Sequence, residues 1–260
     1  NIEKERRISM KSVEEKKKER KLNKGQVAVL KLLYRYRFTT SELLAKAEGQ
    51  KHLQVTRSRL EVLEKQGYIH RRYDNSYKLR GRFAAYCLTA KGLSYLKSID
   101  VAKPQIIKMI YNDPKASEKF VDFCLAVCRT AQALKTYYGE EVKTFTRNEL
   151  VDYDYFPQPQ PDLYLSIKRD GVRHYFVDLH DDAAPTFVLA KKMKKYAEHQ
   201  ESGEWDTTGS DYPEVIIVCL SPAGEKRLRK KLQQTAIGDL MVYTATIGAL
   251  ETDSENTPFT

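Results

Sequence analysis

Two acidic side chains in the C-terminal half border successive predicted strands, close to a histidine and a lysine in the sequence. Asp162 stands at the start of one predicted strand and Asp178 near the end of the next, with His180 two residues beyond and Lys192 on the following helix. Two carboxylates can hold a divalent metal, and a nearby lysine can position or activate the attacking water. Asp162 and Asp178 are therefore the candidate metal ligands. Together with His180 and Lys192 they are the candidate catalytic residues.

The elements that must position these side chains form an α/β pattern. A mostly apolar helix is followed by apolar strands and amphipathic helices in the order α-β-β-β-α-β, extended by α-β. This order resembles the restriction-endonuclease-like fold, whose members usually show PD at the first acidic point and (D/E)-x-K at the second. The predicted elements are helices at 115–138, 187–198 and 222–233 and strands at 142–146, 162–167, 173–180, 214–220 and 240–246.

The chain departs from that motif at one position. His180 stands where the lysine would be, and histidine carries little positive charge at neutral pH. Lys192 or Lys195 could supply the missing cation from the helix, and Glu118 or Asp122 could add a further acid from the first helix. We expect a degenerate site. An active Mg²⁺-dependent DNA endonuclease and an unrelated α/β domain, in which the two aspartates only border strands, remain alternatives. No cofactor is predicted unless the nuclease-like site is active.

Positive charge is concentrated in the first hundred residues. They hold 25 lysines and arginines against 11 acids, whereas residues 101–260 hold 20 against 24. The net charge of +10 for the whole chain thus comes from its N-terminal part. Clustered cations gain affinity for a polyanion by releasing counterions from its phosphates, so the expected partner is a nucleic acid.

The basic region has the element order of a winged helix-turn-helix domain. Apolar periodicity, hydroxyl caps and glycines predict three helices, then a two-stranded hairpin and a closing helix. The predicted fold class is therefore mixed α/β (α+β), a winged helix-turn-helix followed by a restriction-endonuclease-like domain. Helices are expected at 25–36, from 43 to the glycine at 49 and at 52–66, hairpin strands at 68–73 and 77–88, and the last helix at 90–97. The expected buried face of the third helix carries Leu53, Val55, Leu60, Val62 and Leu63.

In a winged helix the third helix lies in the major groove and the hairpin, or wing, contacts the backbone. Glutamine and arginine on the outward face of that helix suit bidentate contacts with adenine and guanine edges. A winged helix that serves only protein contact is the rival interpretation. The predicted DNA-binding residues are Lys51, Gln54, Arg57, Ser58 and Arg59 on the helix and Arg71, Arg72, Lys78, Arg80 and Arg82 on the wing.

The whole arrangement resembles the replication-relaxation family over roughly residues 23–246. That resemblance implies association with bacterial plasmids and conjugative elements and a role in DNA replication or mobilisation. Members often lack the lysine of the second acidic motif, which agrees with a decayed site here. The residues that carry the resemblance, besides the winged-helix pattern, are Pro161-Asp162, Asp178-x-His180 and Lys191-Lys192-x-Lys194-Lys195-Tyr196.

We expect a DNA-binding accessory protein that binds double-stranded DNA and assists a relaxase or a replication initiator, and self-association into a homodimer stays open. A winged-helix transcriptional regulator is an alternative. No apolar run reaches the ~20 residues of a membrane span and no secretory signal is present, so a cytoplasmic protein without a membrane partner is predicted. The predicted domains are a charged arm (1–21), a winged helix (22–98), a linker (99–114), the restriction-endonuclease-like domain (115–250) and a polar tail (251–260).

Overall fold

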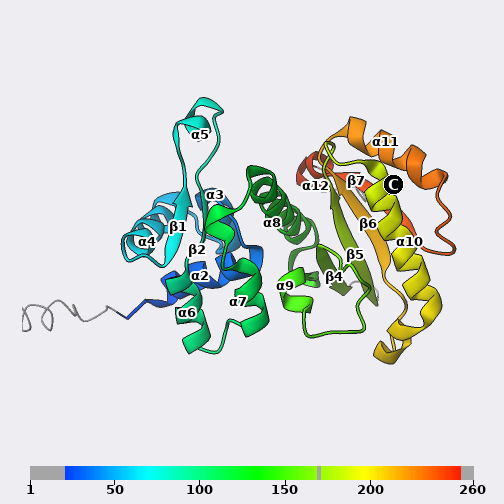
Figure 1. Cartoon of the computed structure of the whole chain (residues 1–260), viewed down its shortest axis with the longest axis horizontal. Coiled ribbons are helices and arrows are strands. Elements are labelled where there is room, and N and C mark those ends of the chain that lie inside the picture. The colour runs from blue at the N-terminus through cyan, green and yellow to red at the C-terminus, as the bar shows by residue number, and fades with distance from the viewer. Residues whose placement is uncertain (1–20, 169–170, 253–260) are drawn as a thin grey trace, which may run out of the picture.

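The computed structural model describes residues 21–168 and 171–252, in a mainly helical first half and an α/β second half (Figure 1). The predicted charged arm, apart from Lys21, and the predicted tail beyond residue 252 lie outside the described residues. The elements of the first half are α2 (Lys24–Tyr36), α3 (Ser41–Ala47), α4 (Leu53–Lys65), β1 (Ile69–Arg72), α5 (Asn75–Leu79), β2 (Ala85–Leu88), α6 (Ala90–Ser98) and α7 (Pro104–Ile110).

Side-chain caps begin several of these helices. Asn23 forms a capping box with Gln26 at the start of α2, and the hydroxyls of Thr40 and Thr89 accept backbone N–H groups at the starts of α3 and α6. Such caps satisfy N–H groups that have no partner inside the helix. These three helices and α4 bury their apolar stripes in one core, whose fully buried members include Leu30, Leu33, Leu44, Leu60, Leu63, Leu93 and Leu96.

The predicted second hairpin strand, 77–88, is wrong in its first part. The Asp74 carboxylate accepts the backbone N–H groups of Ser76 and Tyr77 and so caps the short helix α5. Tyr77 is buried, and its hydroxyl bonds to Glu118, so tertiary contact favours the helical turn. Only Ala85–Leu88 pairs with β1, in an antiparallel ladder.

One further expectation about the first half needs correction. Val55 and Val62 of α4 are exposed by 41% and 39%, and Thr56 takes a place in the buried face instead. The predicted linker, 99–114, contains α7, and Ile106 and Ile110 of that helix are buried in the core of the first half.

The second half confirms the predicted order of helices and strands, with α9 and α12 added. The strands form one mixed sheet in the order β3-β4-β5-β6-β7, in which β3, β4 and β5 are antiparallel and β5, β6 and β7 are parallel. Its elements, including 3-10 turns labelled η, are η1 (Asp113–Lys115), α8 (Glu118–Tyr138), η2 (Gly139–Glu141), β3 (Val142–Thr146), α9 (Arg147–Leu150), β4 (Leu163–Lys168), β5 (Val172–His180), α10 (Thr186–Ser202), η3 (Glu204–Thr208), β6 (Glu214–Cys219), α11 (Pro222–Gln233), β7 (Val242–Thr246) and α12 (Ile247–Thr252).

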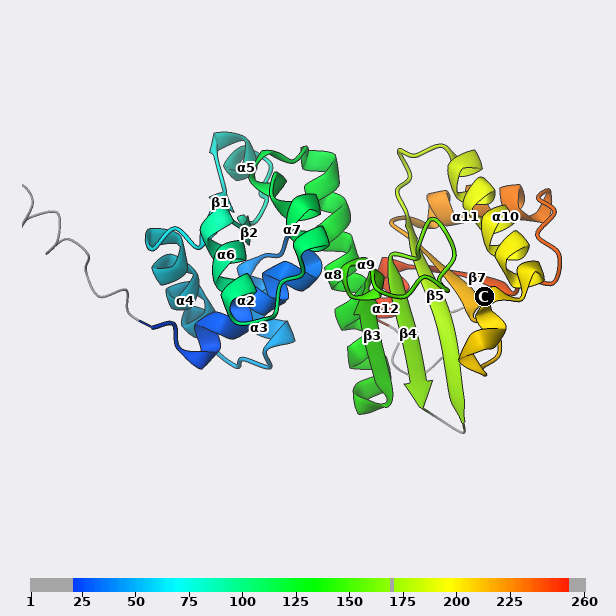
Figure 2. The same ribbon diagram turned by 60° about the horizontal axis from the view of Figure 1, so that its bottom comes forward.

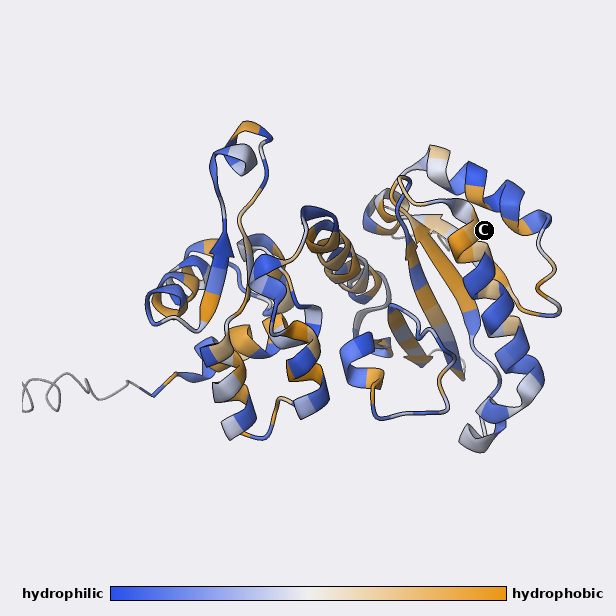
Figure 3. Ribbon diagram, in the orientation of Figure 1, coloured by the Kyte–Doolittle hydropathy of each residue, from blue (hydrophilic) through white to orange (hydrophobic). Residues whose placement is uncertain are grey.

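Helices cover both faces of this sheet. On β5, Val177 packs toward α8 and α12, whereas Phe176 packs toward α10 and α11, because successive strand residues point to opposite faces. The strands are apolar along much of their length and lie between the helices (Figure 3). Figure 2 shows the antiparallel strands β3, β4 and β5 side by side, with α8 along the sheet. The outcome is a three-layer α/β/α domain.

The two halves share a small core of their own. Phe38, Tyr77 and Cys87 of the first half are buried with Val121 and Cys124 of α8. The four cysteines of the chain are buried free thiols. Among the residues that the structure describes, no helix combines the length and apolar character needed to cross a bilayer.

Candidate functional site

The outward face of α4 presents a group of polar and basic side chains. Lys51, Gln54, Arg57 and Ser58 are all exposed. Arg57 donates a hydrogen bond to Glu42 of α3 across 3.2 Å, but its side chain keeps 49% exposure. A surface pair of this kind is weak and leaves the guanidinium free to change partner. Four of the five predicted helix residues are therefore accessible to a ligand.

Arg59, the fifth, is turned toward the body of the domain. Its guanidinium makes two hydrogen bonds, of 3.0 and 3.1 Å, to the Glu48 carboxylate, whose side chain is only 7% exposed. It also lies over Gly25 of α2, where an added Cβ would approach the guanidinium carbon to 2.5 Å. Arg59 thus connects α2, α3 and α4.

The hairpin cations fall into two groups. Arg71, Lys78 and Arg80 are exposed, whereas Arg72 and Arg82 are partly buried against α8. The exposed group agrees with the predicted wing contacts. The guanidinium groups of Arg72 and Arg82 donate instead to acidic side chains of the chain itself.

Glu118, at the start of α8, anchors the hairpin. It accepts hydrogen bonds from Arg72 and from the Tyr77 hydroxyl, the latter at 2.7 Å, and pairs with Arg82 at 3.3 Å. Arg82 also pairs with Asp122 one turn further along α8. Glu118 and Asp122, considered as further acids of the nuclease-like site, are therefore partners of the wing arginines, a role for which the sequence holds no local signal.

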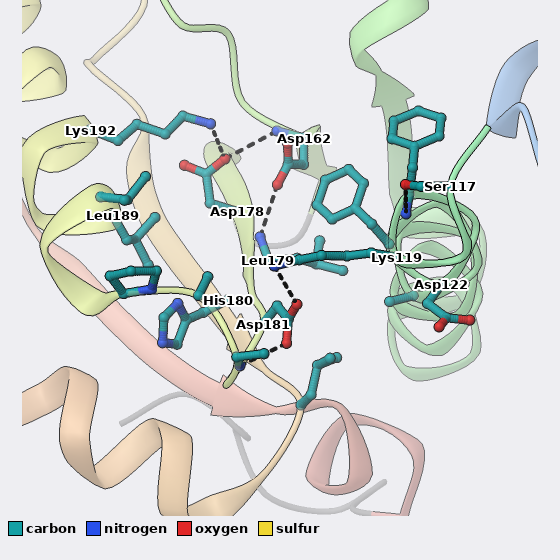
Figure 4. A pocket seen from close by; sticks show the side chains of 18 of the residues that line it. Ser117, Lys119, Asp122, Asp162, Asp178, Leu179, His180, Asp181, Leu189 and Lys192 are labelled. Atoms are coloured by element: carbon teal, nitrogen blue, oxygen red, sulfur yellow. Dashed lines mark hydrogen bonds and ion pairs between the residues drawn. The ribbon is translucent and has the colours of Figure 1, made fainter. Parts of the chain in front are cut away.

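The predicted acidic pair does come together where β4 begins beside β5 (Figure 4). Asp162 directly precedes β4 and Asp178 lies on β5, and both are buried. The backbone N–H of Asp162 donates to Oδ1 of Asp178 at 3.2 Å, and the backbone N–H of Leu179 donates to Oδ2 of Asp162 at 3.0 Å. Antiparallel pairing of β4 with β5 sets this reciprocal arrangement.

Each aspartate is paired with its own cation. Lys192 of α10 lies 2.5 Å from Oδ1 of Asp178, and Arg147 of α9 lies 2.5 Å from Oδ1 of Asp162. Both cations also donate to the carbonyl of Gln160, at 2.9 and 3.1 Å. We call Arg147, Asp162, Asp178 and Lys192 the charged quartet. Its two negative and two positive charges balance.

Arg147 is the member that sequence reasoning missed. Thr146-x-x-Glu149 is a capping box, a pattern that indicates the short helix α9. That pattern does not reveal that the Arg147 side chain reaches Asp162, fifteen residues away in sequence. The contact depends on the path of the chain between α9 and β4.

Burial governs the titration of this region. Burial raises the pKa of Asp162, while Lys192 and Arg147 beside it act in the opposite direction. His180 is 3% exposed, and burial lowers the pKa of its imidazole despite Asp181 and Asp182 nearby. His180 makes no hydrogen bond or ion pair to the quartet within the described residues. Lys192, and not His180, therefore provides the positive charge beside the two acids.

The two carboxylates offer little room for a metal ion. Three of their four oxygens already accept hydrogen bonds, and the fourth, Oδ2 of Asp178, is buried without a partner. Mg²⁺ requires near-octahedral oxygen coordination, and no group of three or more acids, histidines or cysteines in the described part of the chain is arranged to hold a metal. In this arrangement the residues do not fit a divalent cation. The metal and catalytic assignments stay predictions.

A large cleft lies beside the quartet. Its volume is about 1080 Å³, and it is lined by the hairpin, α8, the loop before β4, the end of β5 and α10. In Figure 4, Lys192 and Leu189 reach it from α10, and Lys119 and Asp122 lie opposite on α8. The cleft is thus built by both halves of the chain.

The model of the family described as replication-relaxation matches residues 30–215, more than two thirds of the chain. The match includes α4, the hairpin and all four members of the charged quartet. No curated protein and no solved structure matches the chain.

Proposed function

The chain belongs to the replication-relaxation family, and from that premise we propose that it binds duplex DNA as an accessory protein of plasmid or mobile-element replication or conjugative mobilisation. The family suggests a role in replication or relaxation of such elements. The observation that carries DNA binding is the exposed face of α4 with Gln54, Arg57 and Ser58, together with exposed Lys51 just before the helix. The proposed partners are double-stranded DNA and a relaxase or replication initiator.

The winged-helix interpretation of the first half supports this function. Three helices, an antiparallel hairpin and a closing helix follow in the order typical of that domain, and α4 is the third helix. Gly92 allows the close approach of α6 to the hairpin, since an added Cβ would lie 2.2 Å from the Tyr68 carbonyl oxygen. In the proposed complex α4 enters the major groove, and Gln54 and Arg57 contact base edges. Arg71 and Lys78 contact phosphates, whereas Arg59, Arg72 and Arg82 hold the domain together and Arg80 faces the cleft.

The second half is proposed to be a restriction-endonuclease-like domain without nuclease activity. The charged quartet supports this view, because each carboxylate already has a cationic partner at 2.5 Å. The quartet joins α9, β4, β5 and α10 and keeps the cleft in shape.

A footprint on DNA of the parent element tests the proposal. Protection at the replication or transfer origin, weakened in Arg57→Ala and retained in Lys65→Ala, is the expected result. Lys65 is a matched control, because it is exposed at the other end of α4. Protection confined to the chain's own promoter would instead support a transcriptional regulator, and no protection would contradict DNA binding.

A metal-dependent nuclease is the second candidate, and one contact favours it. Lys192 touches Asp178, so a lysine from α10 reaches the place where the superfamily motif has its own lysine. The assay is Mg²⁺- or Mn²⁺-dependent nicking of supercoiled plasmid. Nicking that disappears in Asp178→Ala would establish this activity, and intact plasmid in the presence of either metal is the result expected here.

A further inference from the structure

The cleft between the two halves has the composition of a ligand site. Its volume of about 1080 Å³ slightly exceeds the usual range for small-molecule pockets, roughly 300–1,000 Å³. Apolar side chains form much of its wall, among them Phe120 and Phe123 on α8 and Val188 on α10. Val188 is 55% exposed, so this wall is open to an incoming molecule. The apolar wall is suited to a planar or apolar group.

One polar atom of the cleft lining lacks a partner. Oδ2 of Asp178 is buried without a hydrogen bond. A buried polar atom without a partner is costly unless a ligand or water satisfies it. His180 also lines the cleft, and its imidazole makes no side-chain hydrogen bond within the described residues. A ligand with hydrogen-bonding groups on a flat ring would meet both the apolar wall and these polar groups.

Cations stand on both sides of the cleft. Arg80 lies on the hairpin side and Lys191 on the α10 side, and both are exposed cleft residues. Neither side chain takes part in an ion pair within the part of the chain that the structure describes.

The acids of the cleft, in contrast, have cationic partners. Asp178 pairs with Lys192, Asp122 with Arg82, and Asp181 with Lys119 at 3.5 Å. The charge that remains to attract a ligand is therefore positive, and it flanks an apolar wall.

We propose that this cleft binds a single strand of DNA. Unpaired bases expose flat faces that can pack on Phe120, Phe123 and Val188, and the phosphates reach Arg80 and Lys191. A basic groove with aromatic side chains is the usual platform for single strands. A duplex keeps its base faces stacked inside the helix and could not use the apolar wall. The cleft is separate from the exposed face of α4, so this site extends the proposed function to the strand released when duplex DNA opens.

Fluorescence anisotropy with a labelled strand of about 15 nucleotides, and with the same sequence as a duplex, tests the proposal. The variants are Lys191→Gln and Arg80→Gln, with Lys194→Gln as the matched control. Lys194 is exposed on the same helix and makes no contribution to the cleft wall. Arg57→Ala reports separately on the duplex site of α4. A salt series is measured for each protein.

Loss of one phosphate contact flattens the plot of log K against log[salt] by about 0.7, which is about fivefold in affinity at about 0.1 M salt. We expect this change for the single strand in Lys191→Gln and in Arg80→Gln, an unchanged affinity in Lys194→Gln, and little effect of Arg57→Ala. Equal loss in Lys191→Gln and Lys194→Gln would overturn the site in favour of diffuse attraction. Duplex binding without single-strand binding would overturn it and leave the proposed function standing. Single-strand binding without duplex binding would support the cleft site and contradict the proposed duplex-binding function.

Discussion

The ammonium group of Lys192 lies 2.5 Å from Oδ1 of Asp178, although the two residues belong to α10 and β5. The contact is nearly inaccessible, since the side chains of the two residues are exposed by 13% and 1%. Arg147 makes the equivalent contact with Asp162. Electroneutrality of the quartet explains how two carboxylates can be buried side by side, because each has a cation within hydrogen-bonding distance.

Breaking one ion pair of the quartet should destabilise the fold. Removal of one partner leaves an uncompensated buried charge, so Lys192→Met should lower the free energy of unfolding by about 3–5 kcal/mol. Asp178→Asn should also be destabilising. The double variant should lose clearly less than the sum of the two single losses, because neither charge then remains alone. Urea unfolding of the four proteins measures this coupling, and additive losses would show that the contact has no energetic weight.

Neighbouring arginines of the hairpin should behave differently. Arg72→Ala should lower the free energy of unfolding by about 1–2 kcal/mol, because Arg72 donates to Glu118 and to the Ala116 carbonyl oxygen at 2.5 Å. Arg71→Ala should leave stability within about 0.5 kcal/mol, since Arg71 is exposed, but should weaken duplex binding. Thermal unfolding and DNA titrations of both variants separate the two effects. The opposite pattern, with Arg72 controlling affinity at constant stability, would contradict the anchoring role of Glu118.

Stability should fall on mild acidification, in part through His180. Burial lowers the pKa of the folded imidazole below its unfolded value, so the unfolded chain binds the proton more readily. The loss of stability begins as the pH drops through about 6.5, the ordinary pKa of histidine. His180→Asn should therefore lose less stability than the wild type between pH 7 and pH 5. His70→Asn, at an exposed position, is the control, and an equal pH dependence in wild type and His180→Asn would contradict this assignment.

Local sequence signals predicted the helices and strands well where the pattern of apolar residues decides the secondary structure. The strands of the second half are short segments rich in β-branched, aromatic and other apolar residues, so their order was predictable, and Asp162 and Asp178 followed from their positions near strand ends. The hairpin was harder to predict, because Asp74 caps a short helix there. The Tyr77 hydroxyl of that helix donates a hydrogen bond to Glu118, which lies far along the chain.

The partners of charged side chains were the least predictable feature. The sequence predicts Arg59, Arg72 and Arg82 to be DNA-binding cations. In the fold, each of them forms an ion pair with an acidic side chain. Arg147 gave no sign of its contact with Asp162. These pairs join residues from separate elements, so their identity depends on packing and not on local pattern.

Duplex DNA binding, measured by fluorescence anisotropy at several salt concentrations with fragments of the parent element, tests the central claim most directly. Wild type, Arg57→Ala and Lys65→Ala are compared on the same fragments. The account predicts preference for one fragment, a steep decrease of affinity with salt, and loss of the preference in Arg57→Ala but not in Lys65→Ala. Absence of binding at low salt, or a preference that survives Arg57→Ala unchanged, would contradict recognition through α4.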